Sequence, residues 1–193
     1  MRFSETEVKH IGIALFVITL ALTLFFFGSF SIGGFITMLL TFGVAFICHE
    51  LAHKFVAQRY GYWAEFRYWD MGLMLGILMG ITQKFLFLAP GAVYISSGAH
   101  GISREKNAYI SLAGAATNMV LALVFFIFSR YINLDIGLFG VKINILLAFF
   151  NLLPIPPLDG SKVFAWNKQK WALIFFSITI IGFRVGIFEG LLY

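Results

Sequence analysis

Residues 11–48 read IGIALFVITLALTLFFFGSFSIGGFITMLLTFGVAFIC and contain no Asp, Glu, Lys or Arg. As one helix this run would be about 57 Å long at ~1.5 Å per residue, whereas the hydrocarbon core of a bilayer is only ~30 Å thick. The glycine and serine residues of Gly28–Gly34 loosen a helix near the middle of the run. The stretch therefore predicts two transmembrane helices joined by a tight turn.

The composition places the rest of the chain in a membrane as well. Of 193 residues, 60% are hydrophobic and 12% are charged, whereas about a quarter of the residues in soluble domains are charged. The net charge of +5 comes from basic residues in short clusters between apolar runs, which argues against nucleic-acid binding. A single cysteine, Cys48, excludes an internal disulfide.

Further apolar runs predict three more spans after the first two. The predicted fold is an α-helical membrane protein with about five transmembrane helices, forming one domain over residues 1–193. The expected spans are residues 11–29, 32–58, 107–129, 136–153 and 171–190.

The region after the second span, residues 62–97, is open to two interpretations. Glycines at every fourth position, Gly72, Gly76 and Gly80, are typical of a closely packed helix. Alternating aromatic residues near its start and the turn at Pro90–Gly91 instead predict short strands. If the region dips in and returns, eleven of the fourteen basic residues lie on the inner side, as the positive-inside rule favours. We therefore expect a re-entrant segment that contains a short membrane-associated β-hairpin.

The inner basic residues under this topology are Arg2, Lys9, Lys54, Arg59, Arg67, Lys84, Arg104, Lys106, Lys162, Lys168 and Lys170, and the outer ones are Arg130, Lys142 and Arg184.

His49-Glu50-Leu51-Ala52-His53 follows the uncharged run directly, at the inner end of the second span. Two histidines four residues apart on a helix point about 40° apart, so both imidazoles reach one metal ion while Glu50 faces the same half. Ionisable groups at membrane depth cost roughly 2 to 3 kcal/mol each, and metal binding offsets this cost. The pattern predicts a zinc site at which Glu50 is the base for an activated water molecule.

A catalytic zinc site takes a third protein ligand and keeps one position open. Asp159 is the predicted third ligand, because the proline-rich segment Pro154–Pro157 stops the helix ahead of it. Unwound backbone at membrane depth is tolerated where it is buried in protein or lines a water-filled cavity, and a hydrolase needs such a cavity. The other candidate ligands are Glu65, Asp70, Glu105 and Cys48.

The two motifs together resemble those of the site-2 protease family of intramembrane metalloproteases. The resemblance rests on His49-Glu50-x-x-His53 and on Asn151-x-x-Pro154-x-x-x-Leu158-Asp159-Gly160, and it extends over residues 35–162. It implies that His49, His53 and Asp159 bind one zinc ion per chain and that Glu50 is the catalytic base.

The same resemblance implies that Asn151 is a polar active-site residue near the developing oxyanion or the substrate backbone. The family motif Gly-Pro-x-x-Asn stands here as Gly114-Ala115-Ala116-Thr117-Asn118, with alanine in place of proline. Asn118 is therefore a candidate supporting residue, with an interhelical hydrogen bond as its alternative role. No stretch is long enough for a PDZ or CBS domain, so the chain resembles a minimal member.

The predicted function is hydrolysis of peptide bonds within or near transmembrane segments of membrane-protein substrates, that is, regulated intramembrane proteolysis. The expected setting is the cell membrane, with a multi-pass chain in the lipid bilayer and an active site towards the cytoplasmic side. One alternative is a membrane ion or metal transporter that uses the same His, Glu and Asp groups, although the chain shows no internal repeat. A catalytically silent scaffold of the same fold is another.

Overall fold

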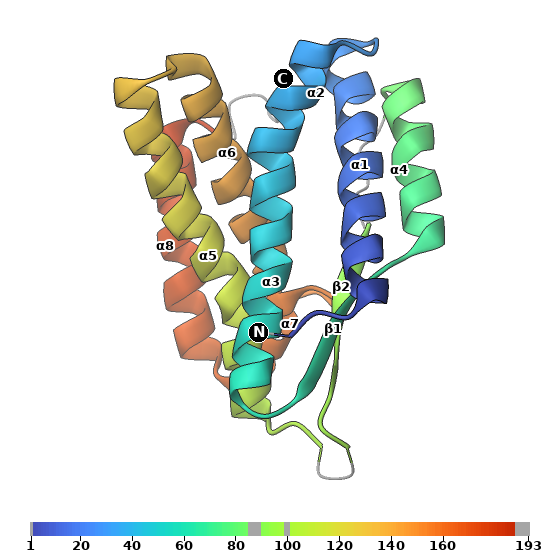
Figure 1. The fold of residues 1–193 in the computed structure, drawn as a ribbon. Helices are drawn as coiled ribbons and strands as arrows, with labels where there is room; N and C mark the ends of the chain where they lie inside the picture. Colours follow the sequence, from blue (N-terminus) through green and yellow to red (C-terminus); the bar gives the residue numbers. More distant parts are fainter. Residues whose placement is uncertain (1, 85–89, 99–100, 188–193) are drawn as a thin grey trace.

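The computed structural model describes residues 2–84, 90–98 and 101–187. It is a helical protein with one small sheet at the end of the molecule where the chain begins (Figure 1). The elements in chain order are α1 (Glu5–Phe27), α2 (Ile32–Met38), the π-helical turn η1 (Leu39–Gly43), α3 (Val44–Arg59), β1 (Trp63–Tyr68), α4 (Asp70–Thr82), β2 (Gly91–Ser96), α5 (Arg104–Tyr131), α6 (Leu134–Asn151), α7 (Asp159–Trp166) and α8 (Lys168–Val185).

The long uncharged run is divided where its glycine and serine residues predict a break. Helix α1 ends at Phe27, and Gly28 takes the left-handed conformation with φ 72°. The next helix begins at Ile32, where the Ser31 hydroxyl accepts a hydrogen bond from Gly34 N at 3.1 Å. From there α2, η1 and α3 form one continuous helical stretch over residues 32–59. The first and second predicted helices are therefore present.

Four helical stretches in the described part of the chain are long and apolar enough to cross a membrane. They are α1, the α2–η1–α3 stretch, α5 and α6. The fifth predicted span corresponds to α8, which carries Lys168, Lys170 and Arg184 and is not among the four. Its membrane crossing stays a prediction, and residues 188–190 of that span lie outside the described residues.

The region between α3 and α5 combines both interpretations of its sequence. Strands β1 and β2 pair antiparallel, with Phe66 opposite Val93. Trp69 N donates to Pro90 O at 3.0 Å, so the segment between the strands leaves and returns at one point. That segment contains α4, which packs along α1 so closely that a Cβ on Gly80 would lie 2.5 Å from Ala21 O. The predicted β-hairpin and the glycine-mediated helix packing are therefore both present, and residues 85–89 lie outside the described residues.

The position of Lys84 corrects the predicted distribution of basic residues. The neighbouring Gln83 side chain donates to Leu24 O at 3.0 Å and to Phe25 O at 3.1 Å. These carbonyls lie at the end of α1 that is far from Arg2. Lys84 therefore belongs with the predicted outer group. The prediction failed because hydropathy does not reveal how deep into the membrane a segment such as α4 reaches, and α4 runs alongside α1 to the far end of that helix.

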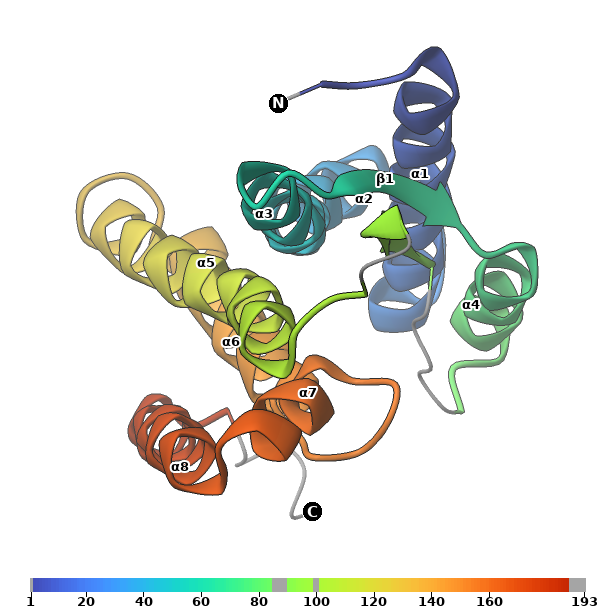
Figure 2. The same ribbon diagram turned by 90° about the horizontal axis from the view of Figure 1, so that it is seen from below.

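Helix α3 lies between two packed groups of elements. Figure 2 shows α1, α4 and the sheet on one side of α3, and α5, α6, α7 and α8 on the other. The first group shares a core with Leu22, Phe46 and Phe66, and the second group shares a core with Ile145 and Ile178. Because α3 carries His49 and His53, the histidine motif belongs to the helix that lies between the two groups.

Candidate metal centre

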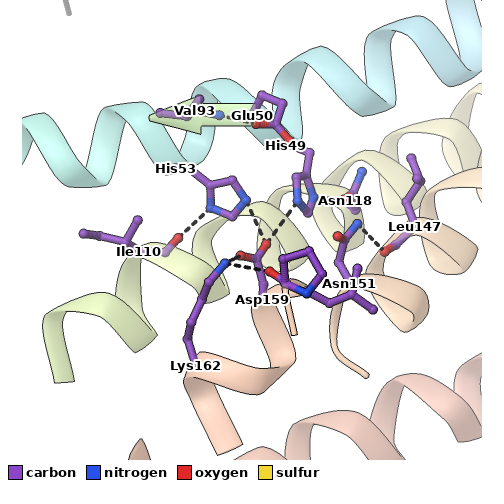
Figure 3. A network of polar contacts seen from close by, with 12 residues as sticks. His49, Glu50, His53, Val93, Ile110, Asn118, Leu147, Asn151, Asp159 and Lys162 are labelled. Atoms are coloured by element: carbon purple, nitrogen blue, oxygen red, sulfur yellow. Dashed lines mark hydrogen bonds and ion pairs between the residues drawn. The ribbon is translucent and has the colours of Figure 1, made fainter. Parts of the chain in front are cut away.

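Helices α3 and α7 bring the three predicted ligands together. His49 and His53 lie one turn apart on α3, and Asp159 is the first residue of α7. Asp159 Oδ2 lies 3.4 Å from His49 Nε2 and 2.9 Å from His53 Nε2 (Figure 3). One potential ligand atom from each residue lies within 4.8 Å of the others. Within residues 2–84, 90–98 and 101–187, this is the one such group of three or more His, Cys, Asp or Glu residues.

The proline-rich segment delivers Asp159 as the sequence predicts. Helix α6 ends at Asn151, and turns carry the chain to the start of α7 at Asp159. A Cβ on Gly160 would collide with the carbonyl of Leu152, so this position requires glycine. Trp171 Nε1 donates to the same carbonyl at 2.8 Å. The turn is thus held both by close backbone packing and by a side chain of α8.

The hydrogen-bond partner of each imidazole sets which nitrogen faces the centre. His53 Nδ1 lies 2.7 Å from Ile110 O, a carbonyl that only accepts, so Nδ1 carries a hydrogen. His49 Nδ1 lies 2.6 Å from Asn118 Oδ1. In both rings the Nε2 atom therefore faces Asp159, which is the arrangement of a metal-binding histidine with a supporting partner behind it.

A second asparagine fixes the orientation of the Asn118 amide. Asn118 Nδ2 donates to Ala45 O at 3.2 Å and to Asn144 Oδ1 at 3.0 Å. Because the NH2 group is used in this way, the Oδ1 atom faces His49. Asn144 Nδ2 in turn donates to Gly140 O at 2.9 Å, and the side chains of Asn118 and Asn144 are fully buried. This series of hydrogen bonds therefore runs from Asn144 on α6 through Asn118 on α5 to His49 on α3.

The donor set fits a metal ion. With Nδ1 protonated, each Nε2 presents a lone pair towards the Asp159 carboxylate, and these acceptors repel one another unless a cation lies among them. The ammonium of Lys162 contacts Asp159 Oδ1 at 2.9 Å, and an opposite charge at this distance favours the ionised carboxylate. Asp159 is therefore ionised, which is the form that binds metal. Two imidazoles and one carboxylate are a usual set for catalytic zinc.

Glu50 lies beside this group without joining it. The residue is 8% exposed, and its Oε2 accepts a hydrogen bond from Val93 N on β2 at 3.0 Å. Glu50, both histidines and Asp159 line a cavity of about 930 Å³, together with β2, the start of α5 and the end of α6. The candidate metal centre, the Glu50 carboxylate and strand β2 therefore all border the same cavity.

Comparison with known proteins identifies the family. The model of peptidase family M50 matches residues 37–139, which is more than half of the chain. The chain belongs to peptidase family M50. The matched range contains both histidines, Glu50 and Asn118 and ends before Asp159, so Asp159 is placed beside them by the structure rather than by the match.

Relatives of this M50 chain carry zinc metalloprotease names. The putative zinc metalloprotease MJ0611 of Methanocaldococcus jannaschii is 43% identical over 95% of the chain and 95% of its own length. Zinc metalloprotease MJ0392 of the same organism is 27% identical over 62% of the chain and 31% of its own length. The putative zinc metalloprotease YwhC of Bacillus subtilis is 26% identical over 65% of the chain and 66% of its own length. No solved structure gives a significant match to the chain.

These findings confirm the resemblance to the site-2 protease family. The M50 chain is a zinc metalloprotease with a helical membrane fold. Among the residues that the structure describes, the geometry provides one group that suits the metal, formed by His49, His53 and Asp159. The individual roles of these residues, of Glu50, and of Asn118 and Asn151 stay predictions.

Of the other predicted residues of this M50 protein, Asn151 lies at the cavity, whereas the alternative metal ligands lie outside the group of His49, His53 and Asp159. Asn151 lines the cavity, where one N–H of its amide donates to Leu147 O at 3.0 Å and the other has no hydrogen-bond partner among the described residues. Glu65 is paired with Arg67 instead of facing the histidines. The alternative ligands outside the group at the centre are Glu65, Asp70, Glu105 and Cys48.

The roles of three residues at the centre were not predicted from the sequence of this M50 chain. Asn144 holds Asn118, Gly114 lies against the His49 ring, and Lys162 Nζ contacts Asp159 Oδ1 at 2.9 Å. Asn144 is the second polar residue in the otherwise apolar core of α6, after Lys142, and this is the signal that would have found it. Lys162 follows Asp159 by three residues on α7, a spacing that places the two side chains on one face.

Proposed function

We propose that this M50 protein hydrolyses peptide bonds within or near transmembrane segments of other membrane proteins, as in regulated intramembrane proteolysis. The observation that carries the proposal is the convergence of His49, His53 and Asp159, with Glu50 beside them, in one cavity between helices apolar enough to span a bilayer. A protease for soluble proteins would have no need to place its centre there, because ionisable groups at membrane depth are costly.

In this proposal His49, His53 and Asp159 hold zinc, which would supply Lewis-acid activation of water and of the scissile carbonyl. Glu50 accepts the proton of the attacking water and passes it to the leaving amine. Its position on the cavity wall supports this role, as does its spacing of one residue from His49. The remaining N–H of Asn151 donates to the oxyanion that forms at the substrate carbonyl.

The substrate has to be unwound before it is cut, because a helical carbonyl is already hydrogen-bonded within its own chain. We assign the outer edge of β2, which pairs with no other described strand, as the surface that pairs with the extended segment, by strand addition. The other edge of the sheet is covered by α1, since Glu7 Oε1 accepts from Phe66 N at 2.9 Å and His10 Nδ1 accepts from Tyr68 N at 3.2 Å. The edge of β2 instead borders the cavity, and its Val93 N–H contacts Glu50.

A substrate strand on this edge would take over the Val93 N–H. Glu50 would then lose its hydrogen bond to β2 and become free to act as a base. The arrangement supports a coupling in which occupation of the strand edge prepares the carboxylate.

The proposed location is the cell membrane with the active site towards the cytoplasmic side. The start of α1, near Arg2 and Lys9 in the sequence, and the end of α3, at Arg59, lie at the end of the molecule that also carries the sheet and α7 (Figure 1). Basic residues are enriched on the cytoplasmic side of membrane proteins, which supports this orientation. Lys84 at the other end reduces the bias without reversing it.

The test is Glu50→Gln in the purified full-length protein, with Glu105→Gln in the exposed first turn of α5 as the matched control. We expect Glu50→Gln to bind one zinc per chain and to lose cleavage of membrane-protein substrates, while Glu105→Gln keeps both. Metal flux into vesicles that depends on Glu50, with no proteolysis by the wild type, would instead identify a transporter. His49→Ala is expected to lose the zinc itself.

A further inference from the structure

A fully buried ion pair lies next to the metal centre and has no part in the chemistry described so far. Lys54 follows His53 on α3 and contacts Glu7 of α1, and the side chains of both residues are 0% exposed. The ring of Phe3 covers Lys54 Nζ at 4.2 Å from its centroid. Buried ion pairs are costly to desolvate and are weak evidence for stability alone. The pair therefore calls for a different explanation.

The second oxygen of Glu7 points to the sheet. Glu7 Oε2 contacts Lys54, while Glu7 Oε1 accepts from Phe66 N of β1 at 2.9 Å. Phe66 lies opposite Val93 of β2, and both N–H groups point away from the partner strand. The carboxylate of Glu7 therefore joins the α3 lysine to the centre of β1.

The sheet touches α3 a second time through its other strand. Val93 N donates to Glu50 Oε2 at 3.0 Å, and Glu50 precedes Lys54 by four residues on α3. Two side chains one helical turn apart thus hold the two strands at the same pair of residues, Glu50 directly and Lys54 through Glu7. The sheet has one register along α3 that satisfies both contacts.

We propose that Glu7 is a positioning residue for peptide hydrolysis, because the acceptor that it presents to Phe66 N fixes the register of the β1–β2 sheet relative to Glu50 and the metal centre, while Lys54 compensates its buried charge. The inference rests on the proposed function, in which a substrate strand pairs with β2. A shift of a strand by one residue turns every side chain to the opposite face, so the register decides which substrate carbonyl reaches the centre. Displacement of a reacting group by ~1 Å costs about a hundredfold in rate.

Three double variants separate anchoring of β1 from simple filling of space. Glu7→Gln with Lys54→Met removes both charges and keeps a carbonyl oxygen for Phe66 N. Glu7→Leu with Lys54→Met keeps a similar volume and offers no acceptor. The exchange of Glu7→Lys with Lys54→Glu restores an ion pair and places no acceptor at position 7.

The experiment uses the full-length zinc-loaded proteins in lipid vesicles. Amide hydrogen exchange of residues 63–68 and 91–96 reports the sheet, and zinc content with thermal stability reports the centre and the fold. Cleavage is followed on synthetic Leu/Ala-rich peptides of about 20 apolar residues with a central Asn-Gly, a length that spans a bilayer. Mass spectrometry of the products gives the cut position.

We expect the Gln/Met variant to keep wild-type exchange and the wild-type cut position. The Leu/Met and exchanged variants should bind zinc, exchange both strands faster, and either lose about a hundredfold in kcat/KM or cut at displaced positions. Rescue by the exchanged pair would show that the ion pair alone matters and would overturn the inference, as would unchanged exchange in the Leu/Met variant. If the wild type cuts none of the peptides, the proposed function fails, and the exchange data still decide whether Glu7 anchors the sheet.

Discussion

Gly114 of α5 lies directly against the imidazole of His49, so that a Cβ on Gly114 would be 2.5 Å from Cε1 and 2.6 Å from Nε2 of that ring. No real side chain is tolerated at such a distance. The absence of a side chain at position 114 therefore makes room for the His49 ring. It also allows α5 to lie close enough for Asn118, one turn further on, to reach His49 Nδ1.

Gly114→Ala is predicted to displace the His49 ring and to lower zinc affinity. The matched control is Gly12→Ala on α1, where no described atom lies within 4 Å of an added Cβ. We expect overpacking at position 114 to cost about 1 to 3 kcal/mol of stability and the control to cost none. Zinc per chain and thermal unfolding measure the two effects, and equal zinc retention in both variants would contradict the prediction.

Asn118→Ala is predicted to weaken zinc binding by about 10- to 100-fold, the usual effect of removing the group that orients a ligand. The reason is that His49 Nδ1 loses its acceptor while Asn144 loses its donor. Competition with a chelator gives the affinity. Asn133→Ser, which keeps a capping oxygen at the exposed start of α6, serves as the control and should bind zinc as the wild type does.

Asp159→Asn is predicted to release zinc, because the amide replaces the carboxylate of the three proposed ligands His49, His53 and Asp159. The exposed Asp135→Asn in the first turn of α6 should have no such effect. Zinc content after dialysis is the measurement. A full complement of zinc in Asp159→Asn would show that another acid completes the site.

Ile95→Pro is predicted to abolish cleavage while zinc stays bound. Ile95 N points away from β1, as the N–H of Val93 does, so proline removes a donor from the open edge and leaves the β1–β2 hydrogen bonds in place. Ile95→Ala keeps this donor and loses only side-chain contacts, so it should retain most activity. Similar cleavage by the two variants would argue that substrates do not pair with β2.

Gly80→Ala is predicted to separate α4 from α1, since an added Cβ would lie 2.5 Å from Ala21 O. The expected loss is about 1 to 3 kcal/mol of stability. Gly33→Ala in α2 meets no described atom within 4 Å and is the control. Unfolding in detergent with increasing denaturant compares the two.

The sequence predicted the parts of this protein that depend on local pattern. The uncharged run and its glycine-serine break gave the first two helices, and the prolines before Asp159 gave the end of α6. The spacing of His49 and His53 gave their common face on α3. Each of these features follows from residues that are neighbours in the chain, and all are present in the structure.

Other features depend on contacts that no local pattern encodes. Helix α6 is apolar on all sides, so its sequence does not tell which way Asn144 points. The pairing of Lys54 with Glu7 joins positions 47 residues apart. The depth reached by α4, and with it the position of Lys84, depends on packing against α1 through glycines. The π-helical turn before α3 follows from no residue pattern that we can identify.

The division of the proposed ligands between α3 and α7 determines when, during its synthesis, this protein can begin to cleave other proteins. Both histidines emerge from the ribosome well before Asp159. The chain between His53 and Asp159 forms two of the four apolar spans, α5 and α6. A partly synthesised molecule would hold two of the three proposed ligands and lack Asp159, which leaves too few ligands for a firmly held catalytic ion. Its capacity to cut would arise only once the proline turn has been inserted and folded, so neighbouring nascent proteins at the translocon would be spared.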